Sequence, residues 1–423
     1  MPAGEADMAE QKKLVHYMRV RTSDDLRYLQ GGLCDELIVN ANQLENSAQA
    51  TAAHLRGTGY GYMIDPVLWR FQVPEWRHNE KGETKRNYRR LAKRYAQGTS
   101  ISMVDGRLLD TVQKSSEWEQ LATNVIAYQR ERLDEMCRLD LLDPLLSREL
   151  RPSRFVAPAL VAQSRREDDV NHLLIEAAAA AAGEDVVGMV IIPRERLNMA
   201  EIGDLLKTVP DKGVRGFVLW TPGMTEDHLV ATHDAFAALV TVIQTLARRG
   251  VPVIQTQLGY AAAAMSMVGL SGVAHHLGWV DRGEPASESG GGPRSCQAYV
   301  PGVRTVMRFN AAASHGRQLG PDEYRDRFCE CAFCMGLFER GEHPLDVLLE
   351  DQAVGESTRR TPSSRATGAN IWHYLLSRRL EVQAFSSGSV DDVIGRDIDR
   401  AAALAGAGQA SWLERLAEEL HAA

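Results

Sequence analysis

The sequence predicts a (β/α)₈ barrel of the TIM type followed by a small metal-binding subdomain. Short β-branched runs alternate with helical segments from Leu37 to Phe309, which is typical of strands joined by helical crossovers. These runs are apolar throughout, as expected for parallel strands that are buried on both faces. A cluster of cysteines follows the last run, and a length of 423 residues suits one large barrel with an appendage.

Eight runs are the expected barrel strands, and eight is the number that closes a barrel of this type. Two of the helices between them are also distinct, namely Asn171–Ala182, which is rich in alanine, and Thr225–Arg249, which stops at Gly250. The expected strands are Leu37–Asn40, Tyr62–Ile64, Arg154–Val161, Val186–Ile192, Gly216–Trp220, Val253–Gln257, Gly272–His276 and Thr305–Phe309.

Three stretches interrupt the alternation and suggest a domain organisation. Residues 1–310 are expected to form the barrel, with a basic and aromatic insertion at 66–100 and a glycine-rich loop at 283–294. Residues 311–388 are expected to form a zinc-binding subdomain. Residues 389–423 are expected to form C-terminal amphipathic helices that pack on the barrel.

Composition limits the function classes. The chain is 44% hydrophobic and 25% charged, as in ordinary globular proteins, and its net charge of −8 confines any nucleic-acid site to a local patch. The start MPAGEADMAEQKK lacks the apolar core of a signal peptide, and the uncharged stretch Leu258–Ala274 is too short and too rich in glycine for a membrane span. We therefore expect a cytoplasmic protein with no membrane partner.

The run CECAFC places Cys329, Cys331 and Cys334 within six residues. Three thiolates can converge on one ion, and Zn²⁺ takes a fourth ligand to complete a tetrahedron. We expect that ligand to be His373 in ANIWHYLLSRRLE, with His343 in ERGEHPLD as the alternative. Such a site leaves no open position, so the Zn²⁺ is predicted to be structural.

Candidate catalytic residues follow two of the predicted strands. Asp65 comes directly after Tyr62–Ile64, where a barrel places reactive groups, although an aspartate before a proline is also a common turn residue. His275 and His276 end another strand, and only one of them should point into the barrel. Asp281 lies on the loop beyond.

Two glutamines end the run Val253–Gln257. Gln255 and Gln257 could hydrogen-bond the edge of a planar base, or they could fill a layer of the barrel.

The segment 69–95 is the candidate polynucleotide contact. It holds nine Lys and Arg against three Glu, a local excess of +6, with five aromatic residues interleaved. Basic side chains neutralise phosphates and aromatic faces stack on unpaired bases, whereas the alternative is a solvated basic helix. The basic residues expected to bind the substrate are Arg77, Arg86, Arg89 and Arg90.

The barrel, the aspartate and the C-x-C-x-x-C cluster with a later histidine together resemble the guanine transglycosylases. The resemblance covers roughly residues 37–388, and CECAFC with His373 in WHYLLSRRL is its specific part. The spacing to His373 is longer than is usual in the family, which an insertion such as GESTRRTPSSRATG accounts for. The resemblance implies exchange of guanine for a 7-deazaguanine in tRNA or, in one branch, in DNA.

The same resemblance implies roles for the acidic residues. Asp65 in IDPVLWRFQ corresponds to the family's general base, although the glycines that usually follow it are absent. The nucleophilic aspartate of the family lies in an F-D motif, where this chain has GLSGVAHHLGWVDR. The second participant is therefore expected among His275, His276 and Asp281. This departure favours the divergent DNA-modifying branch over an ordinary tRNA enzyme.

The resulting expectation is a transglycosylase that acts on DNA, or alternatively on tRNA, with a 7-deazaguanine as the incoming base. A homodimer or partner proteins of a DNA-modification system are further expectations. The alternative is a catalytically inactive homologue that binds nucleic acid or a partner protein. A zinc-dependent hydrolase would need an open metal position, which three cysteine ligands argue against.

Overall fold

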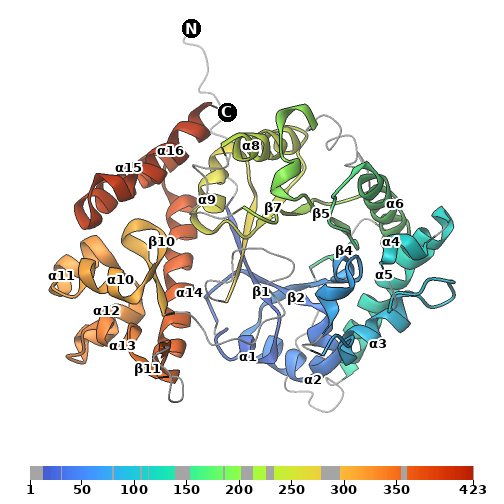
Figure 1. The fold of residues 1–423 in the computed structure, drawn as a ribbon, viewed down its shortest axis with the longest axis horizontal. Helices are drawn as coiled ribbons and strands as arrows, with labels where there is room; N and C mark the ends of the chain where they lie inside the picture. Colours follow the sequence, from blue (N-terminus) through green and yellow to red (C-terminus); the bar gives the residue numbers. More distant parts are fainter. Residues whose placement is uncertain are drawn as a thin grey trace, which may run out of the picture.

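The computed structural model describes residues 13–422, except residues 30 and 113 and the segments 79–80, 105–106, 139–152, 184–185, 202–212, 225–232, 278–295 and 354–359. Eight parallel strands form a nearly closed barrel, which confirms the predicted fold class (Figure 1). The strands are β1 Val15–Val20, β2 Glu36–Asn40, β3 Gly61–Asp65, β4 Phe155–Val156, β5 Val186–Ile191, β6 Phe217–Trp220, β7 Val253–Thr256 and β8 Gly272–His276.

The order of hydrogen-bonded strands is β3-β2-β1-β8-β7-β6-β5-β4. The first and last strands of the chain are thus neighbours, and Arg19 of β1 lies opposite His276 of β8. The two edges of the sheet also meet, because the backbone N–H of Ser153 donates to the carbonyl oxygen of Tyr62 at 2.9 Å. The mouth of the barrel is therefore bordered by the ends of all eight strands.

The prediction missed the first strand of the barrel and assigned to the barrel a last strand that lies outside it. β1 was not expected, because His16 and Arg19 break the apolar run in VHYMRV. The last predicted strand, Thr305–Phe309, is instead β10 (Thr305–Arg308), which pairs antiparallel with β9 (Gln297–Val300) outside the barrel. Asp65 consequently ends the third barrel strand, and His275 and His276 end the eighth.

The interior of the barrel is a packed core. A Cβ atom on Gly272 would lie 2.8 Å from the ring of Tyr17 and 3.2 Å from the side chain of Ile254, so only glycine fits in β8 at this level. Tyr17, Ile254 and their neighbours are almost fully buried. A ligand must therefore bind at the mouth rather than within the barrel.

Helices from the part of the chain before β8 surround the sheet. The predicted helix Asn171–Ala182 lies within α6, and Ser164 caps that helix by accepting from the backbone N–H of Arg166. The predicted Thr225–Arg249 overlaps α8, and its first eight residues lie outside the described part. The helices are α1 Ser23–Leu26, α2 Ala41–Thr58, α3 Arg86–Tyr95, α4 Leu108–Thr111, α5 Ser115–Arg138, α6 Arg165–Ala182, α8 His233–Arg248 and α9 Gly259–Ala264.

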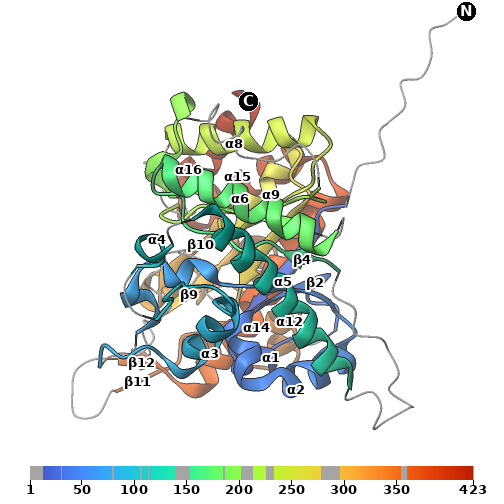
Figure 2. The ribbon, with the colours of Figure 1, turned by 90° about the vertical axis from the view of Figure 1, so that its right-hand side faces the viewer.

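The chain after β8 builds the appended region. Its long helix α14 lies between the barrel and a group of short helices (Figure 1). Helix α16 lies beside α8, and α15 packs against α16 (Figures 1 and 2). No helix among the described residues is long and apolar enough to cross a membrane. The elements are α10 Phe309–Gly316, α11 Pro321–Glu323, α12 Ala332–Glu339, α13 Pro344–Leu348, β11 Asp351–Ala353, β12 Arg360–Pro362, α14 Ser364–Ser387, α15 Val390–Ala405 and α16 Ala407–Ala422.

Candidate functional site

The three cysteines and His373 converge, as predicted from the sequence. The Nδ1 atom of His373 lies 3.6, 3.5 and 3.3 Å from the Sγ atoms of Cys329, Cys331 and Cys334, and all four side chains are buried. A tetrahedral ion with ordinary Zn–S and Zn–N bond lengths separates nitrogen from sulfur by about 3.6 Å. The group can therefore hold a metal ion of this size without rearrangement.

Local structure explains why these four side chains meet. Cys329 follows a short π-helical turn, and Cys331 and Cys334 lie at the first turn of α12, so three thiols face one point. His373 projects from α14, and its Nε2 lies 2.9 Å from the carbonyl oxygen of Tyr299 in β9. A proton on Nε2 leaves the Nδ1 lone pair directed at the thiols, as a metal-binding imidazole requires.

His343 does not belong to this group. Its Nδ1 accepts from the backbone N–H of Leu345 at 3.2 Å and so caps α13, and its Nε2 lies 3.3 Å from the carbonyl oxygen of Leu319. His373 is therefore the fourth member of the group, and the alternative is excluded by the positions of the two side chains. The hairpin of β11 and β12 lies between α13 and α14, in the stretch expected to hold an insertion.

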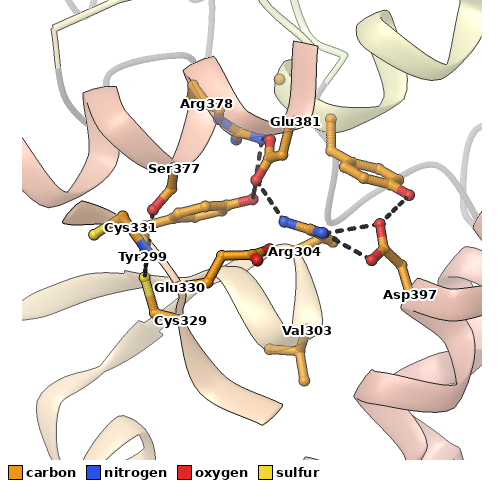
Figure 3. A network of polar contacts seen from close by, with 12 residues as sticks. Tyr299, Val303, Arg304, Cys329, Glu330, Cys331, Ser377, Arg378, Glu381 and Asp397 are labelled. Atoms are coloured by element: carbon orange, nitrogen blue, oxygen red, sulfur yellow. Dashed lines mark hydrogen bonds and ion pairs between the residues drawn. The ribbon is translucent and has the colours of Figure 1, made fainter. Parts of the chain in front are cut away.

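A buried network of charges lies beside the cysteine cluster (Figure 3). The guanidinium of Arg304 contacts Glu381 of α14 at 3.0 Å and Asp397 of α15 at 2.8 Å. The hydroxyl of Tyr260 in α9 donates to Asp397 at 2.7 Å. Burial disfavours the charged form of Arg304, but the two carboxylates raise its pKa well above the ordinary value. The network ties the appended region to the barrel helix α9.

At the mouth of the barrel, Asp65 is held by two donors. Nη2 of Arg19 lies 2.6 Å from Oδ2 of Asp65, and the backbone N–H of Val67 donates to Oδ1 at 2.9 Å. Asp65 and Arg19 are each about 1% exposed, so the ion pair is shielded from water. The position of Asp65 at a strand end agrees with the prediction, whereas its partner Arg19 was missed because β1 was not recognised.

His276 and Gln257 join this end of the barrel. Nε2 of Gln257 lies 3.3 Å from Nε2 of His276, and the indole N–H of Trp220 donates to Oε1 of Gln257 at 2.5 Å. The guanidinium of Arg19 lies over the Trp220 ring at 5.7 Å from its centroid. Burial, together with the nearby cations Arg21 and Arg19, lowers the pKa of His276 well below its usual value, so its ring is neutral.

The other two residues predicted near this site face elsewhere. His275 turns away from the barrel interior, and its Nδ1 lies 3.0 Å from Nε2 of His16. This agrees with the expectation that only one of the adjacent histidines points inward. Gln255 faces the outer side of β7 and bonds Thr221 and a backbone carbonyl. Asp281 lies outside the described residues.

Aromatic and strained residues also border the mouth, and the sequence did not predict Trp220, Val67 or Leu258 as part of it. Trp69 packs edge-on against Trp220 with ring centroids 4.8 Å apart. Val67, Gln257 and Leu258 have φ angles of 51°, 68° and 68°, a region that non-glycine residues seldom adopt. Such strain tends to gather at functional sites. No local sequence pattern signals it, because glycine would be the expected residue at each position.

The basic segment 69–95 is partly a core element. Trp69, Phe71, Tyr88 and Tyr95 are buried, so these rings cannot stack on bases as the sequence suggested. Arg77 is fully buried and donates to the backbone carbonyls of residues 71 and 104, which excludes it from a surface contact.

The other three predicted basic residues remain accessible. Arg86, Arg89 and Arg90 lie on α3 and are exposed. Two of them are oriented by the backbone, because Arg89 donates to the carbonyl oxygen of Thr84 and Arg90 to that of Glu45.

No protein-family model matches the chain, and no curated protein matches it significantly. Among solved structures it is similar to xylanase B from Clostridium stercorarium F9, with 9% identity, a TM-score of 0.32 and coverage of 62% of this chain and 86% of that one. A GH26 beta-mannanase from Bacteroides ovatus has 12% identity, a TM-score of 0.37 and coverage of 66% and 83%. The N-terminal endo-1,4-beta-D-xylanase of Clostridium thermocellum has 9% identity, a TM-score of 0.39 and coverage of 66% and 65%. Similarities with such low sequence identity and TM-scores do not indicate a function for this chain.

Proposed function

We propose that this protein is a transglycosylase that exchanges guanine for a 7-deazaguanine base in a polynucleotide, with DNA favoured over tRNA. The observation that carries the proposal is the Asp65 carboxylate, held at the end of β3 by Arg19, in a chain that also has a buried Cys₃His group. This combination resembles the guanine transglycosylases in architecture and in the type of each residue.

The reaction requires a carboxylate that attacks the anomeric carbon of the target nucleotide. The glycosidic C–N bond breaks, guanine leaves with the bonding electrons and takes up a proton, and a sugar ester remains on the enzyme. A nitrogen of the incoming base then attacks the same carbon and displaces the carboxylate. Asp65 is proposed to be either the nucleophile itself or, if Asp281 is the nucleophile, the general base that takes the N–H proton of the incoming base. Each oxygen of Asp65 accepts from one protein donor, which leaves a second lone pair for either role.

The mouth also offers groups suited to a planar base. The amide of Gln257 can donate and accept, and the neutral ring of His276 can do either. The strained turns at Val67 and at Gln257–Leu258 bracket this site, and each such residue costs on the order of 1–3 kcal/mol. A base within a duplex could not reach these groups, so the target must be flipped out or single-stranded.

The Cys₃His group is proposed to bind one structural Zn²⁺. Three thiolates and an imidazole complete the tetrahedron and leave no position for a substrate or water. The ion would join α12 to α14 and, through the hydrogen bond of His373 to Tyr299, would brace the hairpin of β9 and β10. Its part in the reaction is therefore to stabilise the appended region.

The direct test is release of labelled guanine from a polynucleotide when the purified protein is incubated with a 7-deazaguanine base. Single-stranded DNA, duplex DNA and tRNA are compared as substrates. Exchange on DNA supports the proposal, and exchange on tRNA alone would assign the protein to the other branch.

A second candidate, from a different class, is a catalytically inactive homologue that binds nucleic acid or a partner protein. The observation that favours it is the end of β8, where His275 and His276 stand in place of the carboxylate that the family uses. Tight binding of a polynucleotide without guanine release from any substrate would make this the better description.

A further inference from the structure

A basic pocket of about 700 Å³ lies among three helices beside the barrel. It is lined by Glu45 of α2, by Arg90, Lys93 and Arg94 of α3, by Gln97 just after α3, and by Arg132 of α5. The three helices lie side by side in both ribbon views (Figures 1 and 2). The volume is within the range of pockets that bind small molecules or parts of larger ligands.

The pocket has a marked excess of positive charge. Glu45 is the one carboxylate among its lining residues, and it is already engaged by Arg132 at 3.0 Å and by Arg94 at 3.6 Å. Arg94 also pairs with Glu131 at the rim. Arg90 is oriented by a neutral acceptor, the carbonyl oxygen of Glu45, and the ammonium of exposed Lys93 has no hydrogen bond or ion pair with the described residues. A cavity lined in this way favours an anion, even in a protein of net charge −8.

The arginines are held in a geometry suited to phosphate. Arg94 and Arg132 lie over the face of buried Tyr128, at 5.9 and 5.3 Å from the ring centroid, and Glu45 bridges them. A guanidinium fixed in this manner presents a planar set of N–H donors, which match the oxygens of a phosphate group. Since the aromatic rings here are buried, the pocket offers charge and hydrogen bonds but no face on which a base could stack.

The pocket is tied to the catalytic end of the barrel. The hydroxyl of Tyr95, in the last turn of α3, donates to the carbonyl oxygen of Pro66, directly after Asp65. The hydroxyl of Tyr128 in α5 donates to the carbonyl oxygen of Ala41, directly after β2. The walls of the pocket are thus fixed to the turns that follow β2 and β3, so a strand bound in it would lead toward the mouth.

We propose that this pocket binds phosphate groups of the polynucleotide backbone and so holds the strand next to the nucleotide that reacts. The inference rests on the proposed function for the identity of the ligand. It assigns Lys93, Arg94 and Arg132 to the contact, in addition to Arg90. The affinity of this contact should not depend on the base sequence, because backbone phosphates carry no sequence information.

The test is binding of a fluorescent single-stranded DNA oligonucleotide, measured by anisotropy over a range of salt concentrations. The double variant Lys93→Gln/Arg94→Gln should bind at least tenfold more weakly than the wild type near 0.1 M salt. The slope of log affinity against log salt should fall by about 1.4, since two phosphate contacts are lost from a single strand. On an oligonucleotide of the same length without bases, the double variant should lose affinity relative to the wild type by the same factor, because the pocket contacts only the backbone.

The matched control removes two positive charges elsewhere, from exposed Arg248 and Arg317, as Arg248→Gln/Arg317→Gln. This variant should keep the wild-type slope. The proposal would be overturned by an unchanged slope in the Lys93/Arg94 variant or by an equal loss in the control. It would also be overturned if the loss caused by the double substitution disappeared on the oligonucleotide without bases. Guanine exchange is assayed in parallel. If exchange is absent but the slope falls as expected, the proposed function fails and the pocket stands; if exchange occurs and the slope does not change, the pocket fails alone.

Discussion

The guanidinium of Arg19 and the carboxylate of Asp65 meet at 2.6 Å at the mouth of the barrel, although β2 lies between the strands that carry them. Both side chains are almost wholly buried. A charged pair in such a place is costly to bury and is not needed for packing. Under the proposed function, the pair is the fixed part of a reactive site, where the position of one carboxylate matters.

Replacement of Asp65 by asparagine should abolish guanine exchange, because an amide can neither attack the sugar nor accept the proton. The expected loss is at least about 100-fold in rate. Zinc content and the circular dichroism spectrum should match those of the wild type, since the amide oxygen still accepts a hydrogen bond from Arg19. Full exchange by Asp65→Asn would contradict the assignment. Loss of exchange in Asp281→Asn as well would support two carboxylates, with Asp281 as the nucleophile.

The ion pair itself predicts a coupling energy between Arg19 and Asp65. Arg19→Met and Asp65→Leu should each lower the free energy of unfolding by about 3–5 kcal/mol, because each leaves a buried charge without its partner. The double variant should lose much less than the sum of the two. The free energies are measured by urea denaturation with zinc present. Additive losses would show that the two side chains do not interact in solution.

The metal site predicts about one zinc ion per chain. His373→Ala should lose the ion and lower the melting temperature, because the bound metal supplies folding free energy to the appended region. His343→Ala is the matched control and should keep the ion, since that ring caps α13 instead. Elemental analysis and thermal melts measure both. The assignment is wrong if His343→Ala loses the zinc, or if metal-free wild-type protein melts at the same temperature as the metal-bound form.

Buried histidines predict a dependence of stability on pH. Burial, together with the charge of Arg379, lowers the pKa of His16 to about 3. The unfolded chain therefore takes up a proton at His16 near pH 6.5, whereas the folded chain does not until about pH 3. The contribution of His16 is present above pH 6.5 and is lost as the pH falls toward 3, by up to about 1.4 kcal/mol per pH unit.

Urea denaturation between pH 7.5 and 5 tests this expectation, with His16→Gln compared with the wild type. Removal of His16 should reduce the slope of unfolding free energy against pH below about pH 6. A substitution at His315, which is only partly buried, is the control and should leave the slope nearly unchanged. Identical slopes for His16→Gln and wild type would mean that His16 titrates alike in both states.

Local sequence was sufficient to predict those features that a single short stretch of residues specifies. The spacing of Cys329, Cys331 and Cys334 predicted the candidate metal group, because three thiols within six residues can converge on one point. Continuous apolar runs predicted seven of the eight barrel strands, all but β1, since strands buried on both faces tolerate little else. The place of Asp65 followed from the end of one such run.

Tertiary structure decided everything that depends on which segments become neighbours. β1 carries the polar residues His16 and Arg19, so its sequence does not resemble that of a buried strand. It forms a strand because it pairs with β2 and β8, and both side chains become buried there. The same packing buried four of the five aromatic residues of 69–95 together with Arg77, and it left Arg86, Arg89 and Arg90 at the surface. The sequence by itself determined the barrel and the three cysteines of the candidate metal group, because local spacing and hydrophobicity specify them, whereas the structure decided between His373 and His343. Only the tertiary structure determined the partner of Asp65, because a buried charge is stabilised by a residue that is close in space and distant along the chain.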